Sequence, residues 1–201
     1  MLTHNVAILA TLDLSDMKYL VCFLLIALFI NSVKAQNEKA SYNFIRKVVT
    51  AQNDEKMLYC DSISPYAIAE IKRALFDSGT GNKFVLTTNE KKYVRAELNK
   101  MRKYVWRDSL LQNSVLIKKD SINYAFGKSN STNMDGWDYF KRHFGQGYYD
   151  FSKPIFIRNG TMCIFYRGEN CGWLCGGGFV GVYLKRGKKW ILRYELSSWI
   201  S

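Results

Sequence analysis

Apolar residues recur at helical spacing along the first half of the chain, and this pattern predicts three helices there. The first is expected to bury one apolar face, which consists of Ala40, Phe44, Ile45 and Val48. The second follows Ser64-Pro65, a capping residue and a proline suited to the first helical turn. Its expected buried face consists of Ile68, Ile71 and Leu75.

The third predicted helix begins with Thr87 and Glu90, which together form a T-x-x-E capping box. Its apolar face consists of Val94, Leu98, Met101 and Val105. Its opposite face carries the cations Lys91, Lys92, Arg95, Lys100 and Lys103. A shorter helix is predicted between Asp135 and Gly145, because Asp135 can cap its start and Gly145 can end it.

From Pro154 onward the pattern changes to short apolar runs, which predict strands over residues 155–157, 162–167, 179–185 and 190–196. Asn159-Gly160 is a hairpin turn signal, and Gly187-Lys188-Lys189 should reverse the chain before the last strand. Helices followed by strands predict an α+β fold, with N-terminal helices packed on a C-terminal antiparallel β-meander. For residues 106–134 the pattern indicates only strands or loops.

The N-terminal segment has the layout of a secretory signal peptide over residues 17–35. A basic start at Lys18 precedes an apolar run from Leu20 to Ile30, and Val33 and Ala35 are the small residues expected before the cleavage site. The alternative is a retained membrane anchor, which needs about 20 apolar residues, more than this run supplies. We therefore expect cleavage after Ala35 and a mature chain without a transmembrane segment.

The first 16 residues do not suit a signal peptide, because Asp13 and Asp16 stand where such a segment carries positive charge. Translation is therefore expected to start at Met17, with residues 1–16 outside the protein. Residues 36–201 then form one α+β domain, secreted or periplasmic, of a size that can bury its own core.

The chain is basic, with 29 lysines and arginines against 17 aspartates and glutamates and a formal net charge of +12. This balance favours an acidic partner, such as an anionic envelope polymer or an acidic protein. The alternative is a solvated basic surface with no dedicated partner. Nothing in the sequence points to specific recognition of nucleic acid.

Four cysteines follow the expected cleavage site, and an even number in an exported chain indicates disulfides. Cys171 and Cys175 flank a short loop that must reverse between two strands, so a disulfide between them is predicted. Cys60 and Cys163 are then left as a second pair. A redox-active site or a zinc site would be the alternative, but the C-x-x-x-C spacing in a strand-to-strand loop suits neither.

The segment from Gly176 to Gly181 matches G-x-G-x-x-G, the pattern of dinucleotide-binding loops. That pattern binds pyrophosphate only where a strand turns into a helix, and a strand is predicted here instead. The sequence therefore predicts no cofactor.

The expected mature chain contains a single histidine, His143, and it is the only visible candidate for a general base. No carboxylate stands at an orienting spacing from it, so a packing or surface role is favoured. Aromatic residues are dense from Trp137 to Phe151, and Trp137, Phe140 and Phe144 account for a buried helix face. The exposed candidates for a binding surface are Tyr148, Tyr149 and Trp173.

Two segments near the C-terminus are distinctive: the C-G-x-x-C-G loop from Cys171 to Gly176 and the ending Trp199-Ile200-Ser201. With them, residues 84–201 resemble an uncharacterised family of exported Bacteroidota proteins. Further matching segments are 86–90, 105–110, 152–156 and 162–166, together with Trp190. The resemblance implies a bacterial envelope or secreted location and implies no activity.

Two functions follow as hypotheses. The first is an exported, non-enzymatic binding or structural module for an acidic or saccharide-like partner. The second is an envelope hydrolase that uses His143 with a carboxylate brought close to it by the fold.

Overall fold

The computed structural model describes residues 19, 23, 38–49, 56–77, 84–107, 111, 113–127 and 135–201. The chain divides into two compact units, Met1–Ala40 and Ser41–Ser201. In the first unit the described residues, Tyr19, Phe23 and 38–40, are helical. The rest of the predicted signal peptide, with its cleavage site after Ala35, lies outside the described residues and stays a prediction. None of the helices among the described residues has the length and apolar character needed to cross a membrane.

A mixed sheet of seven strands runs through the described part of the second unit. Its strands are β1 (Met57–Cys60), β2 (Ser114–Ile117), β3 (Tyr148–Phe151), β4 (Ile155–Ile157), β5 (Met162–Gly172), β6 (Cys175–Arg186) and β7 (Lys189–Ile200). Their order is β2-β1-β3-β5-β6-β7, with β4 paired to β5. The series β4-β5-β6-β7 is antiparallel, which confirms the predicted C-terminal meander, whereas β1 lies parallel to both β2 and β3.

The predicted helix starts are present, each with its predicted cap. Ser64 caps α2 (Pro65–Lys72), which continues as the π-helical turn η1 (Arg73–Asp77). Thr87 and Glu90 form both hydrogen bonds of the capping box at the start of α3 (Thr88–Met101). Asp135 caps α6 (Gly136–His143) by accepting a hydrogen bond from the backbone N–H of Trp137. Residues 41–48 are helical as well.

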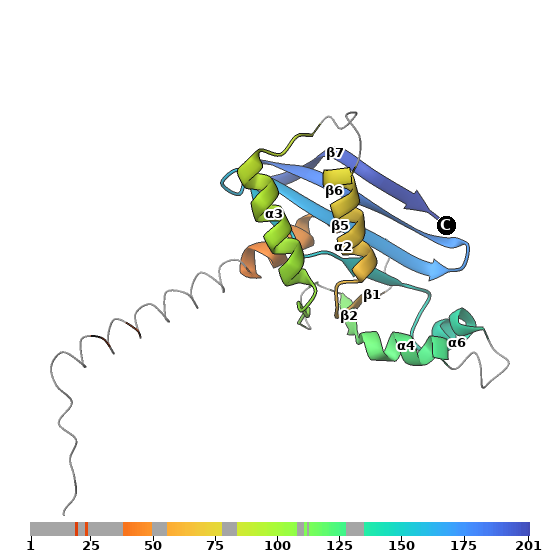
Figure 1. The fold of residues 1–201 in the computed structure, drawn as a ribbon. Helices are drawn as coiled ribbons and strands as arrows, with labels where there is room; N and C mark the ends of the chain where they lie inside the picture. The colour runs from red at the N-terminus through yellow and green to blue at the C-terminus, as the bar shows by residue number, and fades with distance from the viewer. Residues whose placement is uncertain are drawn as a thin grey trace, which may run out of the picture. The chain divides into compact units, whose positions relative to one another are not determined.

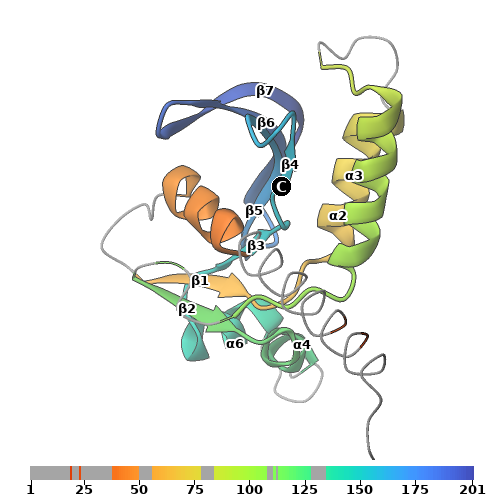
Figure 2. The ribbon, with the colours of Figure 1, turned by 90° about the vertical axis from the view of Figure 1, so that its left-hand side faces the viewer.

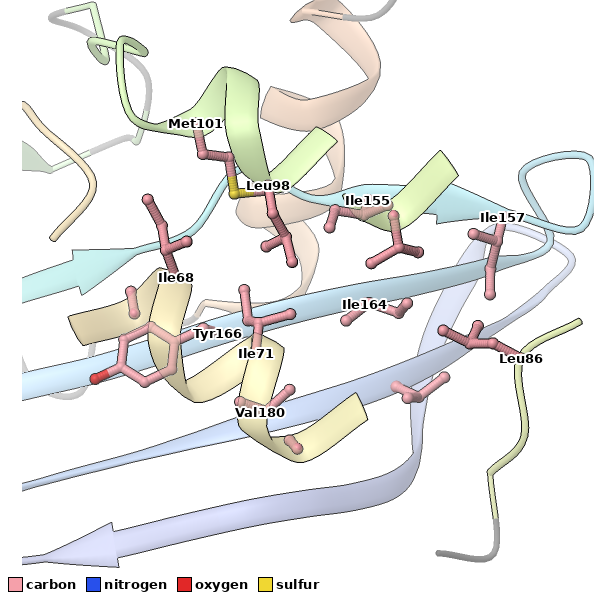
Figure 3. Close-up of a cluster of buried hydrophobic side chains, with 14 of the residues drawn as sticks. Ile68, Ile71, Leu86, Leu98, Met101, Ile155, Ile157, Ile164, Tyr166 and Val180 are labelled. Carbon is pink, nitrogen blue, oxygen red and sulfur yellow. The ribbon is translucent and has the colours of Figure 1, made fainter. Parts of the chain in front are cut away.

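Helices cover both faces of the C-terminal strands, as Figures 1 and 2 show. On one face α2 and α3 pack against β4, β5 and β6, and Figure 3 shows Ile71, Leu98 and Ile164 meeting between these layers. On the other face the helical segment 41–48 contributes Phe44 and Ile45 to a second cluster that includes Phe165. The fold is therefore α+β, as predicted.

The stretch 106–134, for which the pattern indicated only strands or loops, contains both β2 and a helix, α4 (Lys119–Gly127). The helix escaped prediction because only Ile122 and Ala125 are buried along its nine residues, too few to produce a clear helical period. α4 packs beside α6 in a third cluster with Cys60 and Phe140.

Candidate functional site

A pocket of about 490 Å³ lies where β1 ends and α2 begins, and residues of α4, β3, β5 and β7 complete its wall. α2 follows β1 in the chain, and α4 follows β2. Because β1 and β2 are parallel, both helices start at the same edge of the sheet, where the strands have their carboxyl ends. The lining residues are Cys60, Ser62, Ser64, Pro65, Tyr66, Lys119, Ile122, Asn123, Tyr148, Asp150, Tyr166, Asn170 and Trp199.

The centre of the pocket's polar chemistry is Asp150, which lies on β3 and is only 5% exposed. Its carboxylate accepts a hydrogen bond from the Ser64 hydroxyl and a longer one, of 3.4 Å, from the Ser64 backbone N–H. The Ser64 hydroxyl in turn accepts from the Ala67 N–H at 3.0 Å, as the cap of α2. Asp150 is therefore fixed against the N-terminus of α2 by a residue that the helix itself holds in place.

Burial raises the pKa of Asp150, because desolvation disfavours the ionised carboxylate. The two hydrogen bonds from Ser64 and the positive charge of Lys119 act in the opposite direction but do not cancel this effect. The ion pairs found among the described residues are Arg73–Glu70, Lys100–Glu97 and Arg158–Glu90. Asp150 thus has no cationic partner within ion-pair distance in the described part of the chain.

Tyr66, Tyr166 and Trp199 form one aromatic wall of the pocket. The Tyr66 ring meets Tyr166 at 6.3 Å and Trp199 at 5.8 Å between ring centroids, edge to face in both cases. The Trp199 indole N–H donates to the Tyr166 hydroxyl at 3.3 Å. Figure 3 shows Tyr166 at one end of the buried cluster, with its hydroxyl directed away from the other labelled side chains.

Two glycines make room for this wall. Gly168 on β5 and Gly178 on β6 are direct cross-strand partners, and Gly178 is in turn opposite Trp199 on β7. A Cβ atom on Gly168 would lie 2.5 Å from the Tyr166 hydroxyl, and one on Gly178 would lie 2.6 Å from the Trp199 Nε1. The absence of side chains at these two positions therefore lets both rings lie against the sheet.

The remaining lining groups differ in reactivity. Burial raises the pKa of Tyr148 to about 12 and also raises that of the Cys60 thiol, so both are protonated at neutral pH. Asn123 and Asn170 add amide groups that can both donate and accept hydrogen bonds. Lys119 starts α4, and its backbone N–H donates to Asp61 at 3.0 Å.

The structure places the predicted catalytic candidate away from this pocket. His143 is exposed near the end of α6, and its ring lies 4.2 Å from the Tyr139 ring, one helical turn earlier. The pocket lining does not include it. Among the described residues, no group of three or more His, Cys, Asp or Glu side chains is placed to hold a metal ion.

The cysteine predictions have two outcomes. The predicted disulfide between Cys171 and Cys175 is present at the β5–β6 reversal. The second pair, Cys60 with Cys163, is not formed, and both thiols are buried and free. Cys60 belongs to the cluster under α4 and α6, whereas Cys163 belongs to the cluster under residues 41–48, so the two side chains lie in different parts of the core.

The three predicted binding-surface residues are not brought together. Tyr148 is half-buried and lines the pocket. Tyr149 packs instead against the second cluster, with Phe44 and Phe165, and its ring lies 5.0 Å from the Arg167 guanidinium. Trp173 is 67% exposed at the disulfide loop, where its indole N–H donates to Asp135 at 2.7 Å. The glycine-rich segment 176–181 is part of β6, which agrees with its rejection as a dinucleotide loop.

Comparison of the chain with protein-family models, with curated proteins and with solved structures found no match. The geometry of the pocket therefore carries the functional argument. A concave site with aromatic walls and a few converging polar groups is the usual form of a small-molecule site. No local sequence pattern joins the parts of this site, because they come from five separate segments between residues 60 and 199.

Proposed function

We propose that this protein is an exported, non-enzymatic binding protein and that its pocket takes a saccharide-like ligand. The observation that carries the proposal is the joint placement of Tyr66, Tyr166 and Trp199 around the buried carboxylate of Asp150. The C–H faces of a sugar ring pack on aromatic rings, and its hydroxyls donate to a carboxylate. Amide groups such as those of Asn123 and Asn170 suit the remaining hydroxyls.

The position of Asp150 favours a saccharide-like ligand over an acidic one in this pocket. The N-terminus of a helix ordinarily attracts anions, through its free N–H groups and its dipole. At α2 this place is taken by Asp150, which accepts from both the hydroxyl and the N–H of Ser64. The Asp150 carboxylate would repel an anionic ligand, whereas it can accept a hydrogen bond from a ligand hydroxyl.

Two observations support the non-enzymatic part of the proposal: the position of His143 and the protonated thiol of Cys60. His143 is exposed on α6 and outside the pocket lining. The Cys60 thiol lines the pocket, but burial raises its pKa, and a protonated thiol is a poor nucleophile. Both features suit binding better than the alternative of an envelope hydrolase that depends on His143.

A glycan array followed by isothermal titration calorimetry with the strongest hits tests the proposal. Trp199→Leu is expected to weaken binding about 5- to 150-fold, since an aromatic contact in a binding site contributes on the order of 1–3 kcal/mol. Trp173→Leu, at the exposed disulfide loop, is the matched control and should bind like the wild type. Equal loss in both variants, or loss only at Trp173, would place the ligand on the loop and contradict the pocket.

A second surface favours an additional, acidic partner. The Lys47 ammonium donates to the Lys188 carbonyl at 2.8 Å, and this contact joins the helical segment 41–48 to the β6–β7 turn. The exposed cations gathered by this contact, which we name the basic turn, are Lys47, Lys185, Arg186, Lys188 and Lys189. Such a concentration of one sign of charge suits an anionic envelope polymer.

Heparin-agarose, as an anionic polymer matrix, tests the basic turn. The variant Lys188→Glu/Lys189→Glu is expected to elute at lower salt than Lys91→Glu/Lys92→Glu, which makes the same change of net charge on the exposed face of α3. Elution of the two variants at the same salt would show that only net charge matters and would contradict a dedicated surface.

A further inference from the structure

The buried carboxylate of the pocket points to the charge of its ligand. We propose that the natural ligand carries an ammonium group that pairs with Asp150, so that its chemical class is an amino sugar or an oligomer of amino sugars. This inference rests on the proposed saccharide pocket and narrows it.

In the described part of the chain, Asp150 is a buried carboxylate with no opposite charge beside it. It is 5% exposed, and among these residues its donors are the hydroxyl and the backbone N–H of Ser64. Buried charges in proteins are ordinarily paired with an opposite charge or a metal, because an unpaired buried charge loses its hydration without compensation. The three ion pairs among the described residues lie elsewhere, so no cation in this part of the chain offsets the burial of the ionised Asp150 carboxylate, and a cationic group of a ligand can do so.

Lys119 does not fill this role. It is exposed at the first position of α4, and no ion pair joins it to Asp150 among the described residues. Its backbone N–H donates to Asp61 and not to Asp150. A ligand ammonium placed in the pocket can approach the carboxylate more directly than this lysine does.

The aromatic lining suits the same charge. Tyr66, Tyr148, Tyr166 and Trp199 line one pocket with the carboxylate. The faces of aromatic rings attract cations, most strongly when the cation is removed from water, and tryptophan does so better than tyrosine. Aromatic rings beside a buried carboxylate therefore stabilise an ammonium group more than the neutral amide or hydroxyl that replaces it in other sugars.

The net charge of the protein disfavours unspecific binding of a cationic ligand. The chain carries a formal charge of +12, so its long-range field repels a cationic oligosaccharide. A preference for the amine form must then arise from local contacts in the pocket and not from unspecific attraction.

Isothermal titration calorimetry with two matched trisaccharides tests the inference. The free-amine trimer of glucosamine is compared with its fully N-acetylated counterpart, which has the same sugar rings without the charges. The wild-type protein is expected to bind the amine form about 10- to 100-fold more tightly, the ratio typical of a charge-assisted hydrogen bond. Asp150→Asn should remove this preference, whereas Asp138→Asn, an exposed carboxylate of α6, should keep it.

The outcomes separate the two proposals. If the acetylated trimer binds as well as the amine form, and Trp199→Leu weakens it, the saccharide pocket holds and the ammonium inference is overturned. If the amine form is preferred equally in wild type and Asp150→Asn, the inference is also overturned. If neither trimer binds but another saccharide from the glycan array does, and Trp199→Leu weakens it, the ammonium inference is overturned and the saccharide pocket holds. If no saccharide binds, both proposals fail. The wild-type ratio decides the inference even if Asp150→Asn does not fold.

Discussion

Replacing Gly178 by alanine is the sharpest test of how the aromatic wall is built. The new Cβ would lie 2.6 Å from the Trp199 Nε1 and 2.9 Å from the Arg167 carbonyl oxygen, both closer than a carbon can approach without displacement. The indole of Trp199 must therefore move away from the sheet. Its hydrogen bond of 3.3 Å to the Tyr166 hydroxyl is then lost.

The expected destabilisation follows from three contributions. Overpacking of this kind costs about 1–3 kcal/mol, and the lost hydrogen bond adds about 1 kcal/mol. Alanine in a strand recovers about 0.5–1 kcal/mol relative to glycine, since its unfolded state is less flexible. The free energy of unfolding should therefore fall by about 1–3 kcal/mol, which corresponds to a Tm lowered by about 3–10 °C.

Urea denaturation and differential scanning calorimetry measure this change, and saccharide binding provides a second readout. Gly177→Ala is the matched control: its Cβ would meet only the Trp199 carbonyl oxygen, at an ordinary 3.4 Å. This control should be neutral or slightly stabilising and should bind normally. If Gly178→Ala matches Gly177→Ala in both stability and binding, the glycine pair does not position the wall and the reasoning is wrong.

Three further predictions concern Asp150 and the cysteines. Because burial raises the pKa of Asp150 above its value in the unfolded chain, the free energy of unfolding should fall as the pH rises from the unfolded-state pKa through the folded-state pKa. Urea titrations between pH 4 and 8 should show this fall in the wild type and a smaller fall in Asp150→Asn. Replacing both Cys171 and Cys175 by serine should lower the free energy of unfolding by about 2 kcal/mol, as expected for a very short loop, and an unchanged urea midpoint would contradict this. Intact mass with thiol labelling, on protein from its native host, should give Gln36 to Ser201 with two thiols that react only after denaturation; a full-length mass would contradict the signal peptide, and two disulfides would contradict the free cysteines.

The features predictable from the sequence are those that depend on local chemistry. The caps at Ser64, Thr87 and Asp135 are visible because each helix start places a side-chain acceptor next to its own free N–H groups. The hairpin at Asn159-Gly160 is visible for a similar reason: both residues, with Arg158, adopt the positive φ that such turns require.

The parallel strands and the pocket depend instead on distant pairings. β1 and β2 are only four residues long each, which is too short for a clear alternation of apolar and polar residues. α2 and α3 lie between them in the chain, so the sequence does not indicate that the two strands pair. No neighbouring residue in the sequence marks Asp150 as a site residue. Its partner Ser64 stands 86 residues earlier and reaches the carboxylate only in the folded chain. The role of Gly178 depends on Trp199 being its cross-strand partner, a register that the sequence alone does not specify.

The most direct test of the pocket is a ¹⁵N-edited NMR titration of the indole N–H signals with the saccharide that binds most tightly. The chain has five tryptophans, so the indole region is simple enough to assign by single Trp→Phe variants. We expect the Trp199 signal to shift most, because its N–H lies in the pocket wall against Tyr166. A shift confined to Trp173 at the disulfide loop, with Trp199 unchanged at saturation, would contradict it.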